Sequence, residues 1–253
     1  MTIEIKNAQK TVKESHIVIK NAQEALKEGH THAKILIWAN SGTGKTWLSA
    51  TAPKPLIMLT EANGAVSVGH SNPLADIVVI NTIPQLREII KLANTGQLDS
   101  YDTLVFDSIT EIQRMFKDEI IGNKEQLSIK EWGTLAKKMQ SFIRKIRDLP
   151  FHIICTALAD RTTDDEGATL SNLPQFEGKK TANEIMQFFT AVGYLFNTTK
   201  TVENETVRVR KLMFESSDKW FVKPCHPLGN QENPNMTEII QSIITGEVQN
   251  EQA

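Results

Sequence analysis

Residues 35–46 read Ile-Leu-Ile-Trp-Ala-Asn-Ser-Gly-Thr-Gly-Lys-Thr, and this stretch decides the fold. It opens on an apolar run that predicts a strand. Ala39–Thr46 then follows the phosphate-binding pattern G-x-x-x-x-G-K-[ST] at every fixed position except the first. A segment that starts a helix comes next, so strand, loop and helix stand in the required order, which a chance Gly-Lys-Thr in a surface loop would lack. We therefore predict that this loop binds the triphosphate of a nucleotide.

Each position of the loop has an expected role. The glycines let the backbone turn its N–H groups toward the phosphates, and the helix N-terminus adds the positive end of its dipole. Lys45 would neutralise the β- and γ-phosphates, and the Thr46 hydroxyl would coordinate Mg²⁺. Ala39 stands where the pattern has glycine, which the loop tolerates if the φ angle there is negative. The residues expected to contact ATP are Ala39, Asn40, Ser41, Gly42, Thr43, Gly44, Lys45 and Thr46.

Composition sets the broad class. The chain has 253 residues, 40% of them hydrophobic and 23% charged, which suits one large domain or one domain with appendages. Its formal charge of −2 gives no overall basic field, so a nucleic-acid contact would have to come from a local patch or a partner surface. No apolar run approaches the roughly 20 residues that span a bilayer, and the N-terminus lacks a signal-peptide pattern. We expect a cytoplasmic protein without a membrane partner, whose Cys155 and Cys225 are reduced thiols in no metal-ligand spacing.

From Lys34 onward, short apolar runs alternate with longer segments of helical period. This alternation predicts an α/β fold with a mostly parallel central sheet flanked by helices. The predicted strands are Ile35–Trp38, Leu56–Leu59, Ile77–Ile80, Thr103–Phe106, Ile153–Ala157, Val192–Phe196 and Val207–Phe214. The predicted helices are Lys45–Ala50, Ile83–Asn94, Ile109–Ile120, Ile129–Asp148, Ala182–Phe189 and Thr237–Ile244.

The chain divides into three predicted parts. Residues 1–33 form an N-terminal extension, in which Ile3–His16 and Ile17–His30 are a short tandem duplication. Each copy is too short to bury a core, so an N-terminal arm or a strand–helix extension is a better interpretation than a repeat fold. Our hypothesis is that such an arm docks onto a neighbouring subunit. Residues 34–225 form the core, and residues 226–253 form a C-terminal helix with a flexible tail from Gly246.

Two segments of the core carry distinctive charge. The helix over Ile129–Asp148 has one apolar stripe, and its many cations are best explained as a solvated face. Asp160–Lys180 is polar and acidic, without a sustained period. It is longer than an ordinary connection, which favours a functional or mobile loop.

An acidic residue ends the predicted strand before Ser108. Asp107 is placed to hold a Mg²⁺-bound water beside the phosphate-binding loop. The alternative is that Asp107 caps the helix that begins near Ile109, although Ser108 could serve that role. The strength of the loop motif favours the Mg²⁺ role.

Hydrolysis also needs a group that orients or deprotonates the attacking water. Glu61 follows the strand Leu56–Leu59 and precedes a turn that would expose it, and a solvent-facing strand end is nearly as good an interpretation. Thr156 ends another strand with a hydroxyl that could sense the γ-phosphate, although threonine is common in strands.

The order of these pieces resembles the core of the RecA-type recombination ATPases. It resembles more closely the small phage-encoded members of the AAA-domain group proposed as single-strand-annealing recombinases. The resemblance covers roughly Lys34 to Lys223 and rests on the loop motif, on Leu59-Thr-Glu61, on Leu104-Val-Phe-Asp107 and its following helices, and on the segment that starts at Gly178. It implies that Glu61 is the catalytic glutamate and that Thr156 senses the γ-phosphate.

The resemblance also implies partners. It predicts a RecA-like, Mg²⁺-dependent ATPase that forms a ring or filament on single-stranded DNA during phage recombination, in the cytoplasm of a bacterial host. Asp160–Lys180 takes the place of a mobile DNA-binding loop, although its acids outnumber its cations, which disfavours a phosphate backbone. Lys219 and Lys223 lie where cations reach a neighbour's γ-phosphate.

Two other functions stay open. The first is a nucleotide-switched loader or regulator of a replication protein, which an acidic loop and a duplicated arm would suit. The second is a small-molecule kinase, which shares the phosphate-binding loop but would need an arginine-rich lid that the sequence lacks.

Overall fold

The structure is a computed structural model that describes Asn21 and residues 32–163, 169–178, 180–202, 205–215, 220–225 and 228–247, with the main chain alone for 161–163 and 169–172. The described residues other than Asn21 belong to one compact unit, His32–Ala253. The predicted N-terminal duplication lies outside the described residues apart from Asn21. The part of the predicted flexible tail beyond Glu247 also lies outside them.

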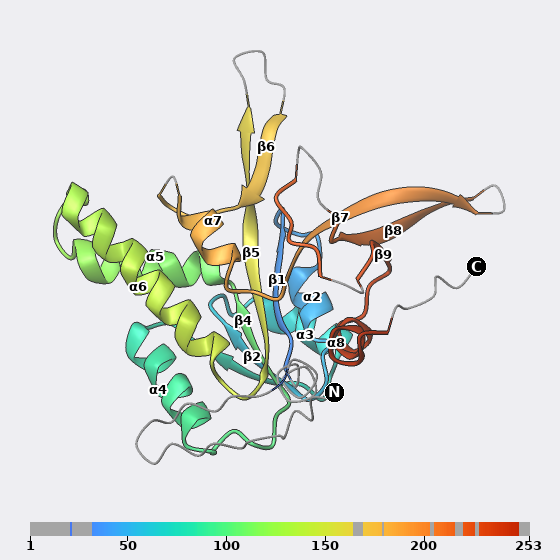
Figure 1. Ribbon diagram of the computed structural model, residues 1–253, viewed down its shortest axis with the longest axis horizontal. Helices are drawn as coiled ribbons and strands as arrows, with labels where there is room; N and C mark the ends of the chain where they lie inside the picture. The colour runs from blue at the N-terminus through green and yellow to red at the C-terminus, as the bar shows by residue number, and fades with distance from the viewer. Residues whose placement is uncertain are drawn as a thin grey trace, which may run out of the picture. The chain divides into compact units, whose positions relative to one another are not determined.

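A nine-stranded sheet forms the centre of this unit, in the order β3-β2-β4-β5-β1-β7-β8-β9, with β6 paired to β5 off that path (Figure 1). The strands are β1 (Lys34–Ala39), β2 (Pro55–Leu59), β3 (Asp76–Val79), β4 (Thr103–Asp107), β5 (His152–Thr163), β6 (Thr169–Pro174), β7 (Ala191–Val202), β8 (Glu205–Met213) and β9 (Gln231–Glu232). All pairs from β3 across to β7 are parallel, whereas β5–β6, β7–β8 and β8–β9 are antiparallel. The predicted α/β fold with a mostly parallel sheet is confirmed.

Helices cover both faces of the sheet. They are α2 (Lys45–Ser49), α3 (Gly64–Ser71), α4 (Ile83–Asn94), α5 (Ile109–Ile121), α6 (Ile129–Arg147), α7 (Thr181–Met186) and α8 (Met236–Thr245). Three of them begin at a hydroxyl that accepts a backbone N–H: Thr82 and Ser128 form capping boxes, and Ser108 accepts from the backbone N–H of Glu111. Such caps satisfy N–H groups that have no partner inside the helix.

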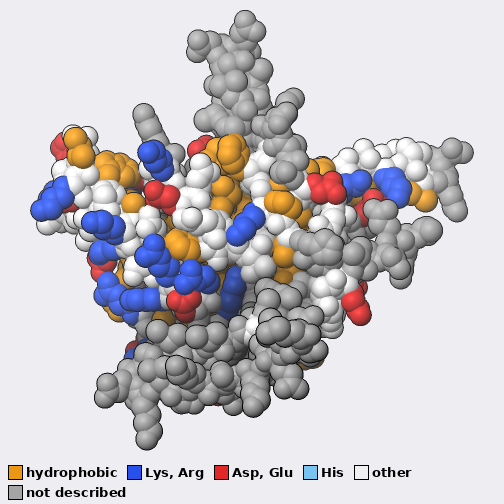
Figure 2. All heavy atoms as spheres, viewed as in Figure 1, with side chains coloured by type: hydrophobic (Ala, Val, Ile, Leu, Met, Phe, Trp, Pro, Cys, Tyr) orange, Lys and Arg blue, Asp and Glu red, His pale blue; other side chains and the backbone are white. Residues whose placement is uncertain are grey.

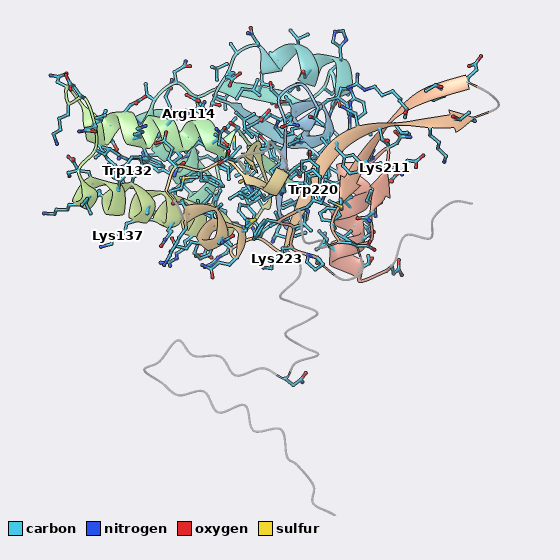
Figure 3. The ribbon with its side chains drawn as sticks, turned by 90° about the horizontal axis from the view of Figure 1, so that it is seen from above. Arg114, Trp132, Lys137, Lys211, Trp220 and Lys223 are labelled. Carbon is cyan, nitrogen blue, oxygen red and sulfur yellow. The ribbon has the colours of Figure 1, made fainter. Side chains whose placement is uncertain are left out.

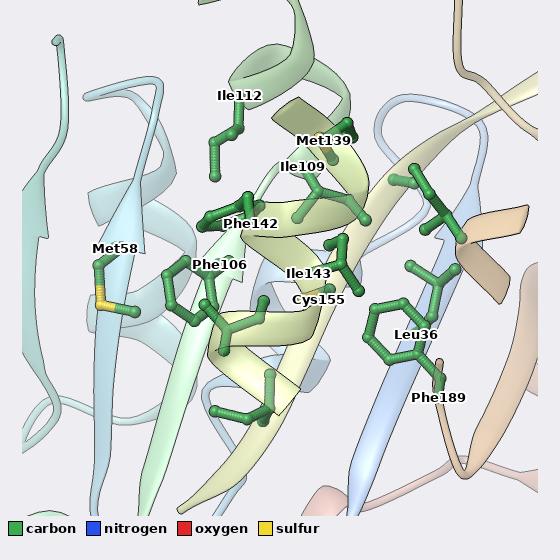
Figure 4. Close-up of a cluster of buried hydrophobic side chains, with 14 of the residues drawn as sticks. Leu36, Met58, Phe106, Ile109, Ile112, Met139, Phe142, Ile143, Cys155 and Phe189 are labelled. Atoms are coloured by element: carbon green, nitrogen blue, oxygen red, sulfur yellow. The ribbon is translucent and has the colours of Figure 1, made fainter. Parts of the chain in front are cut away.

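The core lies in two layers, one on each face of the sheet. Leu36 and Phe106 point into a layer shared with α4, α5, α6 and α7, where Phe142 meets the Phe106 ring edge-on (Figure 4). Their strand neighbours Ile35 and Val105 point into the opposite layer, which α2, α3 and α8 cover. Because β1 and β2 are buried on both faces, they read as continuous apolar runs without alternation.

One predicted loop is different in the structure. Within Asp160–Lys180, β5 continues to Thr163 and pairs with β6, so the segment forms an antiparallel ribbon before α7 begins. Figure 1 shows this ribbon projecting beyond the helices. Main-chain hydrogen bonds hold such a ribbon, and they require no apolar period that sequence reasoning could detect.

Candidate functional site

The phosphate-binding loop lies where the parallel strands end. Ala39 is the last residue of β1, and Lys45 is the first residue of α2. Because the carboxyl ends of parallel strands meet at one edge of a sheet, the ends of β2 and β4 face the same region. A pocket of about 220 Å³ lies there. It is lined by Ser41, Gly42, Gly44, Lys45, Thr46, Leu59, Thr60, Glu61, Gly64, Ser67, Asp107, Ser108 and Leu158.

The loop's backbone explains its glycines. Gly42 has a φ of 72° and Gly44 a φ of 100°, a region that residues with a Cβ rarely adopt. Among the described residues, Lys54 and Asn233 are the non-glycine residues with positive φ, so Ala39 is not strained in this way. The alanine at the first motif position is therefore compatible with the loop.

Hydrogen bonds hold the Lys45 side chain against the first residues of the loop. Its ammonium donates to the carbonyl oxygens of Ala39 and Asn40, at 3.1 and 3.0 Å, and the residue is buried. Burial lowers the pKa of Lys45, and the negative charges of Asp107 and Glu61 oppose that effect. A buried cation whose hydrogen-bond partners are neutral carbonyls is stabilised when an anion binds in the pocket beside it.

Asp107 joins the loop to the neighbouring strand. One carboxylate oxygen accepts a hydrogen bond from the Thr46 hydroxyl, and the other accepts one from the Thr156 hydroxyl. This meeting follows from the strand order, because β5 lies between β1 and β4. Ser108, and not Asp107, accepts the N–H of Glu111 at the start of α5, which answers the capping alternative for Asp107.

Thr60 holds the end of β4 in place. Its N–H and hydroxyl both donate to the Asp107 carbonyl oxygen, at 2.8 and 3.2 Å, and its hydroxyl accepts from the Ser108 N–H at 3.1 Å. The Asp107–Ser108 peptide bond is cis. Glu61 follows Thr60 directly, and its exposed side chain lines the same pocket. Thr60 thus positions the strand ends that carry both candidate carboxylates.

The chemistry of these groups fits Mg²⁺, which prefers oxygen ligands and keeps several waters. The Thr46 hydroxyl and the Asp107 carboxylate are such ligands, and they already lie in contact. No group of three or more His, Cys, Asp or Glu that could hold a metal occurs in the described part of the chain. An ion here would therefore complete its shell with phosphate oxygens and water.

Of the two lysines expected to act on a neighbouring subunit, only Lys223 belongs to the described residues, and it does not line this pocket. Lys219 lies outside the described residues. Lys223, labelled in Figure 3, donates its ammonium protons to the carbonyl oxygens of Phe189 and Gln187, at 2.6 and 3.2 Å. The Lys223 ammonium is thus engaged within its own chain, and its action on a neighbour stays a prediction.

Sequence reasoning missed a second pocket, which adjoins the loop at Gly42 and Thr43. It has a volume of about 330 Å³ and is lined by Gly42, Thr43, Trp47, Asn197, Arg208, Arg210, Asn233 and Pro234. Arg208 and Arg210 fall within the strand predicted over Val207–Phe214, to which no functional role was assigned. The available signal was their spacing of two, which puts both side chains on one face of β8.

The fold and this site define a nucleotide-binding protein of the P-loop class: the loop follows the first sheet strand, and its Lys and Thr meet the carboxylate that ends β4. A family model described as an AAA domain matches residues 31–225. The chain belongs to this family and is an AAA-type P-loop ATPase. No curated protein matches the sequence significantly. In the described residues, no helix combines the length and apolar character needed to cross a membrane.

Proposed function

We propose that this protein hydrolyses ATP with Mg²⁺ and works as an oligomer on single-stranded DNA in phage recombination or strand annealing. The observation that carries the hydrolysis proposal is the Asp107 carboxylate, which accepts hydrogen bonds from Thr46 on the loop side and Thr156 on the strand side. Lys45 and Glu61 line the pocket that contains this carboxylate. The proposal assigns the residues of this one pocket to a phosphate cradle, a metal-ligand pair and a carboxylate base.

The residues divide the chemistry among them. Glu61 takes a proton from the attacking water as the water oxygen bonds to the γ-phosphorus and the bond to the β,γ-bridging oxygen breaks. ADP leaves with the electron pair of that bond. Lys45 and the loop N–H groups stabilise the negative charge that grows on the bridging and β-oxygens. Mg²⁺, when bound, would neutralise further phosphate charge at Thr46 and Asp107.

The DNA proposal is supported by motif order and by one surface. Figure 2 shows Lys and Arg side chains gathered on the face over α6. Lys137, Arg144 and Lys145 are exposed on that helix, and α6 ends in Arg144, Lys145 and Arg147. Such a group of cations can contact several phosphates of a polyanion although the whole chain carries a formal charge of −2.

The test combines ATP turnover with a gel shift, each with and without single-stranded DNA. We expect turnover to rise and a shifted band to form with ATP present. The variant Lys137→Glu with Lys145→Glu should lose the shift and keep basal turnover. Its matched control, Arg87→Glu with Lys91→Glu, makes the same charge change on α4 and should keep both. No DNA binding by the unmodified protein would overturn the recombination role and leave the ATPase standing.

The same experiment distinguishes the recombination proposal from the loader alternative. A loader should show ATP turnover without DNA stimulation, together with ATP-dependent co-purification of a replication protein. Electron micrographs with ATP and DNA would test the oligomer directly, because rings or filaments are expected and isolated monomers would contradict the proposal.

A further inference from the structure

The second pocket contains an unusual pair of side chains. The Arg210 guanidinium carbon lies 4.6 Å from the centroid of the Trp47 ring, which is the geometry of a cation–π contact. The same guanidinium approaches the loop so closely that a Cβ built on Gly44 would lie 2.7 Å from its terminal nitrogen. Arg210 therefore lies against both the first turn of α2 and the phosphate-binding loop.

One hydrogen-bond donor of the Arg210 guanidinium has no acceptor. Its Nε is buried and has no hydrogen-bond partner. Among the ion pairs of the described residues, none involves Arg208 or Arg210, although both line this pocket. Burial and the nearby charge of Arg208 lower the pKa of Arg210. A buried donor without an acceptor costs free energy, so this site gains from a ligand that supplies acceptor atoms.

The two pockets meet at the loop. Gly42 lines both of them, with Lys45 and Asp107 in the first and Trp47 and Arg210 in the second. A ligand whose phosphates occupy the first pocket can thus pass Gly42 and place its remaining part in the second.

We infer that the second pocket binds the base and ribose of the nucleoside triphosphate, with the base packed against the Trp47–Arg210 pair. This inference rests on the proposed ATP binding. Aromatic and guanidinium planes are the surfaces on which bases stack, and the side-chain amides of Asn197 and Asn233 can bond the edge of a base or the ribose hydroxyls. A phosphate bound in this pocket would contact the arginines, but it would have no reason to pack against the Trp47 ring.

The experiment compares the binding of ATP with that of inorganic tripolyphosphate, both with Mg²⁺, by calorimetry. The unmodified protein should bind ATP at least about tenfold more tightly, because only ATP has a base and ribose. Arg210→Ala should remove most of that preference and leave tripolyphosphate binding unchanged. The control is Lys211→Ala, the next residue of β8, whose side chain pairs with Glu232 at 3.5 Å. It should bind both ligands normally.

The outcomes distinguish this inference from the proposed function. If the unmodified protein binds neither ligand, the ATPase proposal fails. Equal weakening of both ligands in Arg210→Ala would assign Arg210 to the phosphates and overturn the nucleoside pocket. Unchanged binding of both ligands would overturn it as well.

A second measurement protects against a misfolded Arg210 variant. Trp47 is 36% exposed, so its fluorescence should respond to a base packed beside it. ATP should change the emission, and tripolyphosphate should not. Trp47→Phe should lose the emission change, because Trp38, Trp132 and Trp220 do not line this pocket. An emission change that persists in Trp47→Phe would contradict stacking at this site.

Discussion

The hydroxyl of Thr156 on β5 donates a hydrogen bond to the carboxylate of Asp107 on β4. The other oxygen of this carboxylate accepts from Thr46 in the phosphate-binding loop. The first bond joins the neighbouring strands β5 and β4, and the second joins β4 to the start of α2, which follows β1 through the loop. A change at the phosphates is therefore linked to β5 through one side chain.

Replacing Thr156 with valine would test that link, because valine keeps the shape and removes the hydroxyl. We expect kcat for ATP to fall by about ten- to a hundredfold, with the Kd for ATP changed little, as for a group that acts during turnover. Steady-state kinetics and calorimetry would measure the two effects. Thr156→Ser restores the hydroxyl and should restore kcat. Equal kcat values for the valine and serine variants would remove Thr156 from the mechanism.

Binding and turnover should separate at Lys45 and Glu61. Lys45→Ala should weaken ATP binding strongly, since it removes the buried cation beneath the loop. Glu61→Gln should keep binding and lower kcat by about 10²–10⁴, because the amide cannot accept the proton of the attacking water. The measurements are the Kd for ATP and single-turnover rates. Unchanged turnover in Glu61→Gln would reassign this residue to the solvent-facing role.

The loop glycines should differ in their tolerance of alanine. Gly42→Ala meets no atom within 4 Å, so it carries backbone strain alone, of about 1–3 kcal/mol. Gly44→Ala carries similar strain and also collides with the Arg210 guanidinium. We expect Gly44→Ala to lower the urea midpoint more than Gly42→Ala does. Adding Arg210→Ala should recover part of the lost urea midpoint in Gly44→Ala and none in Gly42→Ala. If it recovers none in Gly44→Ala, the close approach of Arg210 to Gly44 is contradicted.

Stability should fall on acidification because of His152. Its Nδ1 accepts the Ala33 N–H at 3.1 Å, which requires that nitrogen to be unprotonated. Burial, followed by the charges of His32 and Lys34, lowers the pKa of His152 to about 4, while Asp102 opposes the shift. An unfolded histidine titrates near 6.5. Because the folded pKa is the lower one, the unfolded chain binds the proton first, and stability is lost as the pH falls from about 6.5 toward 4.

Urea unfolding at pH 7, 5.5 and 4.5 would measure this loss. His152→Asn keeps an acceptor near Nδ1 and removes the titration, so its stability should change less over the same range. A parallel decline in both proteins would place the pH dependence elsewhere, for example at His32.

The sequence predicted the sheet and most helices because their signals are local. Ile83–Asn94 was predicted with the bounds it has, since an amphipathic period and a hydroxyl cap mark it. Helix α3 was missed because Gly64–Ser71 contains two glycines, has no side-chain cap and buries Val68 alone. Its position depends on packing beside α2, which no local pattern records.

The candidate site could be predicted where its residues belong to the loop motif or to the end of a predicted strand. Lys45, Thr46, Asp107 and Glu61 meet in one pocket because the carboxyl ends of parallel strands share an edge. The Trp47–Arg210 contact was not predictable, since it joins residues far apart in the chain through the order β1-β7-β8. That order appears only after the strands are paired.

Strand β5 has a mechanical consequence. One strand, His152–Thr163, carries both the residue that touches Asp107 and the residues that pair with β6. At about 3.3 Å per residue, the part from Thr156 to Thr163 spans about 23 Å. A tilt of about 10° at Thr156 would therefore sweep the far end through about 4 Å. A small tilt of β5 at the nucleotide pocket would thus become a larger displacement at the end of the strand that pairs with β6.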